Sequence, residues 1–264
     1  MLLREFDASN DPAGDAEWAN TSTANTSAAQ NFGFQTSQTA TSISDPTAPG
    51  ITAAYDFDTT GSARGGNWSF FGQAGGGRAN NSENTFETFF RLDDLSGTHI
   101  IFEIGGSAAG VSLSVVDNTL VWATNVGGNA DPTLSIQASI GTGWHHAVAL
   151  WNRNSLTTTL YLDGVAIGTV ALPGTTTGWV GGNEGQLGNA SVNASNVASA
   201  ATTYDLGDLT DFDGAIAAFN YYNETLSEET IVNTFDANIV IPEPGSLSLL
   251  AVGLGVIAMR KRST

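Results

Sequence analysis

The sequence contains no cysteine and almost no lysine, and both features restrict the chemistry and the partners that the protein can have. Without cysteine the chain has no disulfide, no thiol nucleophile and no thiolate metal site. It has 8 basic residues against 26 acidic ones, with no lysine before Lys261, so its formal net charge is −18. Such a surface repels phosphate backbones, which excludes nucleic acid as a partner. It suits cations or neutral polymers such as sugars, although simple solubility explains the same charge.

Catalytic motifs are absent as well. Retaining glycosidases need two carboxylates about 5–5.5 Å apart, which on a strand requires closely alternating acidic residues. Glu83 and Glu87 are the nearest glutamates on a predicted strand, and four residues of strand separate them by about 13 Å. No Gly-x-Ser-x-Gly nucleophile motif occurs either. We therefore expect that the protein is not an enzyme.

The neighbouring histidines, His145 and His146, do not change this expectation. Adjacent residues of a strand point to opposite faces, so the two rings cannot bind one metal ion together. One is expected to pack inward beside Trp144, and the other to lie at the surface.

The chain does contain a dense pattern of β-structure. Residues 143–170 predict a three-stranded antiparallel meander, with strands at 143–151, 156–162 and 165–170. Asp163-Gly164 is a strong hairpin signal, because Gly tolerates the positive φ of a type I′ turn. Such a meander in an all-β chain is typical of a sandwich or jelly roll.

The same reading predicts further strands at residues 2–8, 51–57, 85–92, 98–104, 111–116, 119–124, 134–140 and 212–222. Residues 20–49 are rich in Ser, Thr, Asn and Ala, which predicts loop or edge strand with little core. We interpret the glycine-rich stretches 61–81 and 174–188 as loops.

One short helix is predicted near the C-terminus, over residues 227–235. Thr225 and Glu228 have capping-box spacing, which places Thr225 at the N-cap. The predicted fold class is therefore all-β: an antiparallel jelly-roll sandwich over residues 1–240, with one short helix before a separate apolar tail helix. Acidic residues follow Met1 almost at once, so no signal peptide is visible, and we expect the true start to lie upstream.

Residues 241–264 differ in character from the rest of the chain. They consist of an uncharged run, 245–259, between two short motifs, Pro242-Glu243-Pro244 and Arg260-Lys261-Arg262. As a helix this run extends about 22 Å, short of a hydrocarbon core of ~30 Å, so it crosses only with local thinning and snorkelling. The basic cluster is expected to stay cytoplasmic. A buried C-terminal helix is the alternative, but a triple basic cap is hard to bury.

The central segment, GWHHAVALWNRNSLTTTLYLDGVAIG, resembles the laminin-G-like (concanavalin A-like) jelly-roll domains. Those domains commonly read G-W-H-H-V-A, then a turn, then L-Y-x-D-G. Residues 84–102 are similar to the family's preceding strand and loop, and residues 212–226 to its closing strand. The resemblance implies the fold over roughly residues 53–235 and no particular function, because the fold hosts lectins, adhesion modules, glycosidases and structural domains.

The tail resembles the PEP-CTERM sorting signal of Gram-negative bacteria. That resemblance implies export, transient anchoring in the inner membrane through residues 245–259, and processing near Pro242-Glu243-Pro244 by an exosortase-type membrane peptidase. It further implies delivery to the cell surface or extracellular matrix, where proteins with this tail are usually linked to polysaccharide.

An aspartate cluster before the closing strand is a candidate Ca²⁺ site. Asp208, Asp211 and Asp213 would be the ligands, because carboxylate oxygens in a loop suit this ion. The cluster lacks the spacing of an EF-hand, and Asp213-Gly214 is explained equally well as a turn.

Exposed tryptophans are the candidates for a carbohydrate site, since sugars stack on aromatic rings beside amide groups. Trp179 lies between glycines in a predicted loop, with Asn183 nearby, and is the preferred platform. Trp68 and Trp122 have the same chemistry, but a Trp in a jelly roll is more often part of the core.

We therefore predict an exported, non-enzymatic surface or matrix protein that adheres through polysaccharide. An inert structural matrix protein without a specific ligand is the alternative, and a divergent glycoside hydrolase is the third possibility.

Overall fold

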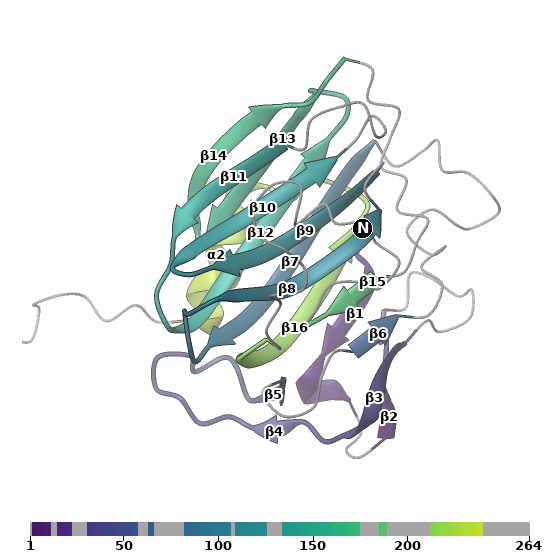
Figure 1. Ribbon diagram of the computed structural model, residues 1–264, viewed down its shortest axis with the longest axis vertical. Helices are drawn as coiled ribbons and strands as arrows, with labels where there is room; N and C mark the ends of the chain where they lie inside the picture. The colour runs from purple at the N-terminus through teal and green to yellow at the C-terminus, as the bar shows by residue number, and fades with distance from the viewer. Residues whose placement is uncertain are drawn as a thin grey trace, which may run out of the picture.

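The computed structural model describes residues 2–11, 15–22, 31–57, 63–65, 82–106, 109–125, 134–174, 185–188 and 212–239. These residues form two antiparallel sheets that lie face to face, with a single α-helix among the described residues (Figure 1). The predicted fold class, an antiparallel β-sandwich, is confirmed.

Sheet A has the strand order β14-β13-β12-β7-β16-β5-β4, and β1 also pairs with β16. Its strands are β14 (Val165–Ala171), β13 (Thr157–Leu162), β12 (Gly143–Asn152), β7 (Glu83–Leu92), β16 (Gly214–Tyr222), β5 (Ala53–Asp56), β4 (Thr41–Ser42) and β1 (Leu2–Asp7). The predicted meander is confirmed as β12, β13 and β14. Asp163 and Gly164 between the last two have φ of 51° and 75°, as the hairpin turn requires.

Sheet B has the order β11-β10-β9-β8-β15-β6-β3-β2. Its strands are β11 (Leu134–Ser139), β10 (Thr119–Asn125), β9 (Ala109–Val116), β8 (Thr98–Gly106), β15 (Gly185–Leu187), β6 (Ala63–Gly65), β3 (Phe32–Gln38) and β2 (Asp15–Trp18).

The space between the sheets is filled by alternate residues of each strand. Phe86 and Phe90 of β7, Trp151 of β12 and Trp122 of β10 belong to one cluster of buried side chains. The Trp122 indole nitrogen donates to the Thr158 hydroxyl at 2.9 Å, so its one polar group is satisfied. Strict alternation makes this core possible, because every second side chain faces the opposite sheet.

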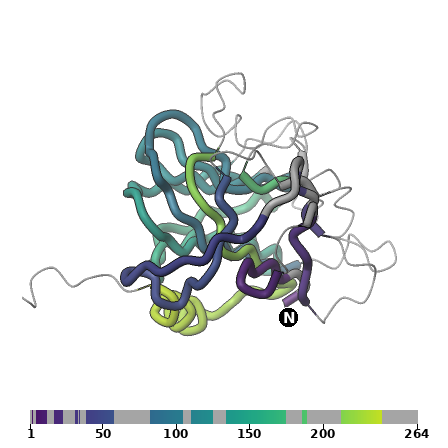
Figure 2. Tube along the Cα trace, turned by 90° about the horizontal axis from the view of Figure 1, so that it is seen from below, coloured from purple at the N-terminus to yellow at the C-terminus, as the bar shows by residue number. Residues whose placement is uncertain are grey.

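The outer face of sheet A is covered by helix α2 (Glu228–Asn238). The side chains that point outward from β12 include Trp144, His146 and Val148, and all three are buried. Phe235 and Ile239 pack on Trp144 and its neighbours. Figure 2 shows α2 and the N-terminal segment on the same side of the molecule.

Three sequence predictions are corrected by these pairings. Within residues 20–49, β3 pairs on both sides, and Phe32 is fully buried in the core, so this stretch is not merely loop or edge. Short strands β6 and β15 lie inside the two predicted glycine-rich loops. The N-cap of α2 is Ser227, whose hydroxyl accepts from the Thr230 N–H, and not Thr225.

Candidate functional site

A polar pocket of about 230 Å³ lies on the outer face of sheet A. Its floor is formed by β7 and β16, one wall by β1 and the 3-10 helix η1 (Ala8–Asn10), and the opposite wall by α2 and residues 50–53. The side chains with polar groups that line it are Glu5, Asp7, Ser9, Thr52, Glu87, Asn220, Tyr222, Thr234 and Asn238.

Three of these residues form a row across neighbouring strands. Glu5 of β1 is directly opposite Asn220 of β16, and Asn220 is directly opposite Glu87 of β7. Directly opposed residues on one face have Cβ atoms about 5 Å apart, so their side chains interact. The register of sheet A therefore brings together residues from the start, the middle and the end of the chain.

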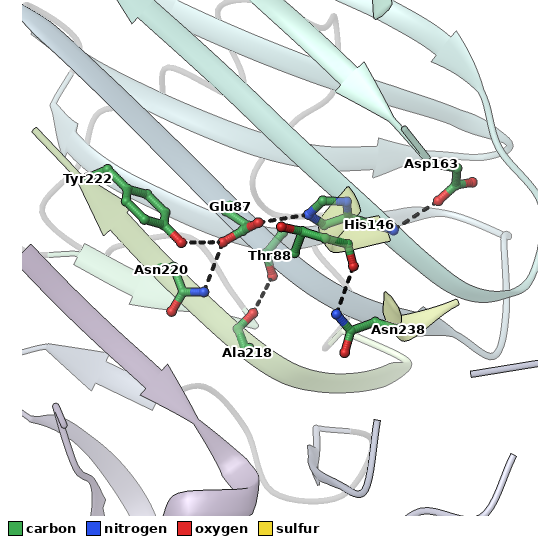
Figure 3. A network of polar contacts seen from close by, with 9 residues as sticks. Glu87, Thr88, His146, Asp163, Ala218, Asn220, Tyr222 and Asn238 are labelled. Atoms are coloured by element: carbon green, nitrogen blue, oxygen red, sulfur yellow. Dashed lines mark hydrogen bonds and ion pairs between the residues drawn. The ribbon is translucent and has the colours of Figure 1, made fainter. Parts of the chain in front are cut away.

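Glu87 is the centre of the hydrogen-bond network (Figure 3). Its Oε1 contacts His146 Nε2 at 3.0 Å, and its Oε2 accepts from Asn220 Nδ2 at 2.9 Å and from the Tyr222 hydroxyl at 2.7 Å. Burial alone would raise the pKa of Glu87, but the bonds and charge of His146, with those of Asn220 and Tyr222, outweigh it and lower that pKa. The carboxylate is therefore held in its charged form although it is only 1% exposed.

His146 supports Glu87 from beneath α2. Its ring is nearly parallel to those of Phe89, at 4.3 Å between centroids, and Phe235, at 6.3 Å. The Asp163 carboxylate accepts from the His146 backbone N–H at 2.9 Å. As predicted, one histidine, His146, is buried beside Trp144. The other, His145, is half-buried on the opposite face rather than at the surface, and it bonds to Asp163 and to the Gly141 carbonyl.

The remaining polar groups of the pocket differ in whether they already have hydrogen-bond partners within the protein. Asp7 accepts from the N–H and hydroxyl of Ser9 and from Asn10, so it caps η1. Burial, followed by the charge of Glu87, raises the pKa of Tyr222, which keeps its hydroxyl a donor. The Asn220 Oδ1 atom is shielded from solvent and has no partner.

The state of Glu87 differs from that of a general acid. A general acid needs a raised pKa, whereas that of Glu87 is lowered and the group is already bound by three donors. Among the described residues no group of three or more His, Asp or Glu is arranged to hold a metal ion. The site can offer acceptors, amides and hydroxyls to a polar ligand.

Most of the predicted site residues, those of the sorting motif included, lie outside the described part of the chain. These are Trp179, Asn183, Asp208, Asp211, Pro242, Glu243, Pro244, Arg260, Lys261 and Arg262, together with Trp68. Asp213 is described and half-buried: its N–H donates to His99 Nδ1 at 3.4 Å, and its carbonyl accepts from the Asp93 N–H at 3.1 Å. Trp122 is fully buried, as expected for a Trp in the core of a jelly roll, and is therefore not an exposed sugar platform.

Sequence reasoning missed the pocket itself. Glu87 was considered only as one of two distant glutamates, and Glu5, Asn220 and Tyr222 were not considered at all. A usable signal was present in TFETFFRL, where a glutamate interrupts an otherwise apolar and aromatic strand. A charged residue at such a position is expected to have buried partners.

The fold and the pocket define a β-sandwich with a polar pocket on one sheet, followed by a separate C-terminal segment. The family model of the concanavalin A-like lectin/glucanases superfamily matches residues 72–232, and the chain belongs to this family. The PEP-CTERM protein-sorting motif matches residues 240–263, which confirms the predicted tail. The comparison with curated proteins found no match.

Solved structures with this fold include receptor-binding domains of bacterial toxins. The binding domain of botulinum neurotoxin DC in complex with rat synaptotagmin II has a TM-score of 0.58 and 11% identity, covering 89% of this chain and 51% of that one. The binding domain of serotype C1 has a TM-score of 0.58 and 13% identity, covering 89% and 52%. The chain thus spans about half the length of these domains, and the likeness concerns the fold alone.

PEP-CTERM motifs are signals for export and membrane-anchored sorting in Gram-negative bacteria. No helix in the part of the chain that the structure describes has the length and apolar composition needed to cross a membrane. The predicted apolar tail, residues 245–259, lies outside that part.

Proposed function

We propose that this protein is a non-catalytic, carbohydrate-binding module of the bacterial cell surface or extracellular matrix. The observation that carries the proposal is the polar pocket on sheet A. Carboxylate, amide and hydroxyl groups there surround an apolar floor made by Phe89, Ala217 and Ala218. This combination suits a sugar, which has hydroxyl groups at its rim and C–H groups on its faces.

A divergent glycoside hydrolase is less well supported. Both hydrolase mechanisms need a carboxylic acid that protonates the leaving oxygen, and this acid has a raised pKa. The pKa of Glu87, whose carboxylate lines the pocket, is instead lowered. Hydrolysis of a β-glucan by the purified chain would contradict the proposal.

A glycan array probed with the full chain in mild detergent tests the binding. We expect hits that weaken when Asn220 is replaced by Ala, because its amide lines the pocket and holds the Glu87 carboxylate in place. Trp179→Ala serves as the second variant, since Trp179 and Asn183 are a proposed alternative platform. Loss of binding with Trp179→Ala alone would move the site to that loop. A folded chain with no hits would instead favour an inert structural matrix protein.

For the tail we propose processing by an exosortase-type peptidase near Pro242-Glu243-Pro244, after transient anchoring in the inner membrane. The family match at residues 240–263 supports this proposal. The test is expression behind a secretion signal in a host with such a peptidase, followed by mass spectrometry of the released protein. Replacing Glu243 by Ala should leave the tail attached, whereas processing of this variant at the normal rate would contradict the assignment.

A further inference from the structure

The pocket on sheet A is more negative than a neutral sugar requires. The carboxylates of Glu5, Asp7 and Glu87 line it, and no lysine, arginine or histidine is among the described lining residues. His146 lies behind Glu87 and contacts that carboxylate only, not those of Glu5 and Asp7. Arg91, further along β7 on the same face, is paired with Asp93 at 2.5 Å. The pocket therefore has a net negative charge.

One acceptor in this pocket, the Glu5 carboxylate, remains available to a ligand. Glu87 already has three donors, and Asp7 is used in capping η1. The Glu5 carboxylate is half-buried and makes no hydrogen bond to another described side chain. The Asn220 Oδ1 atom has no partner but is shielded from solvent, so it acts on a ligand through its partial negative charge and not through a direct hydrogen bond.

The Glu5 carboxylate lies beside Asn220. Glu5 and Asn220 are directly opposed on β1 and β16, so their side chains leave the same face of the sheet about 5 Å apart. A free carboxylate next to an amide oxygen is complementary to a group that has several N–H donors and a positive charge.

Because a primary ammonium is such a group, we infer that the pocket binds the free amine of an amino sugar, with the ammonium on the Glu5 carboxylate. The inference rests on the proposed carbohydrate-binding function and specifies its ligand class. Phe89 and the alanines of the floor then contact the apolar side of the ring. A volume of about 230 Å³ is below that of sites for drug-sized ligands, and it suits a single sugar unit rather than a longer segment.

The test compares two sugars that differ mainly at the nitrogen. Titration calorimetry of the full chain in detergent, at about 0.15 M salt to screen diffuse attraction, would use a glucosamine trimer and an N-acetylglucosamine trimer. We expect the amine to bind at least about tenfold more tightly, because acetylation removes the charge that strengthens its hydrogen bonds.

A matched pair of variants locates the binding. Glu5→Gln removes the pocket carboxylate but keeps its shape, and Glu229→Gln removes an equal charge from the exposed first turn of α2. The first should weaken binding of the glucosamine trimer by about tenfold, as expected for loss of a charge-assisted hydrogen bond, and the second should not. Far-UV circular dichroism and the thermal midpoint show that both variants fold.

The other outcomes overturn the inference in different ways. Equal binding of both trimers would reject the amine but keep the carbohydrate proposal. Equal weakening by Glu5→Gln and Glu229→Gln would reduce the effect to general attraction by an acidic surface. If neither trimer nor any glycan of the array binds, the proposed function fails together with the inference.

Discussion

Glu87 holds its charge in a place where water hardly reaches it. The free energy of that arrangement depends on His146, Asn220 and Tyr222, which all lose their acceptor if the carboxylate is removed. We predict that Glu87→Ala lowers the unfolding free energy by about 3 kcal/mol, as expected when buried polar partners are left unpaired. Urea denaturation measures this change.

Glu83 on the same strand provides the control for that variant. It accepts from Asn152 and Asn154 near the surface, so Glu83→Ala should cost about 1 kcal/mol or less. Equal losses of unfolding free energy for the two variants would show that the buried network around Glu87 stabilises the protein no more than the surface contacts of Glu83 do.

The titration of Glu87 makes stability depend on pH. In the folded protein its pKa lies below the ordinary 4.5, so its contribution is present above pH 4.5 and is lost as the pH falls through the folded-state value. We therefore predict that the stability difference between the native chain and Glu87→Gln is largest at neutral pH and shrinks below pH 4.5. Urea midpoints at a series of pH values measure it, and a difference that grows in acid would contradict the sign.

The sequence could not have revealed this site in full. The apolar strand around Glu87 indicated a buried carboxylate, but its partners come from β12 and β16, far away in the chain. Sheet register alone makes Glu5, Asn220 and Glu87 neighbours, and register is set by long-range pairing. Local patterns thus predicted that His146 lies on the same side of its strand as Trp144. They did not predict which side chains of other strands contact it there.

At the scale of elements, helix α2 forms both a cover for sheet A and a wall of the pocket. Its N-cap is Ser227, with the hydroxyl 3.2 Å from the Thr230 N–H. We predict that Ser227→Ala lowers stability by about 1 kcal/mol, measured by denaturant midpoint, whereas Thr225→Ala has a smaller effect. A larger loss of stability for Thr225→Ala would instead support Thr225 as the N-cap, as the capping-box spacing predicted.

The start of β16 depends on the absence of a side chain. A Cβ at Gly214 would overlap the carbonyl oxygen of Arg91 on β7, and one at Gly141 would meet nothing. We predict a loss of about 3 kcal/mol for Gly214→Ala and little change for Gly141→Ala, compared by thermal unfolding. Similar midpoints for the two variants would mean that β7 and β16 can separate at this end without cost.

Elements with a strong period-two pattern were predicted well, and those without it were not. The meander of β12, β13 and β14 has alternating apolar residues and a Gly-containing turn, so interactions between residues close in the sequence determine it. Strands β3, β6 and β15 have few apolar residues and are strands because they pair with one another and with β8. Such pairing is tertiary information, which overrides weak propensity.

For the whole molecule, Ca²⁺ binding remains a prediction of the sequence. If Asp208, Asp211 and Asp213 hold the ion, saturating Ca²⁺ should stabilise the full chain by about 2.7 kcal/mol at a hundredfold excess over Kd. The thermal midpoint should then rise for the native chain and for Asp236→Asn, an exposed control on α2, but not for Asp211→Asn. An unchanged midpoint for the native chain would rule the site out.

The last described residue, Ile239, is buried against sheet A only a few residues before Pro242. Tension applied through the C-terminal tail therefore acts first on α2, whose contacts through Phe235 and Ile239 would open one after another. Peeling of this kind requires less force than shearing strands along their length. Thr234 and Asn238 would leave the pocket in the same event. If the pocket binds a ligand as proposed, tension on the tail before its processing would therefore weaken that binding before the sandwich unfolds.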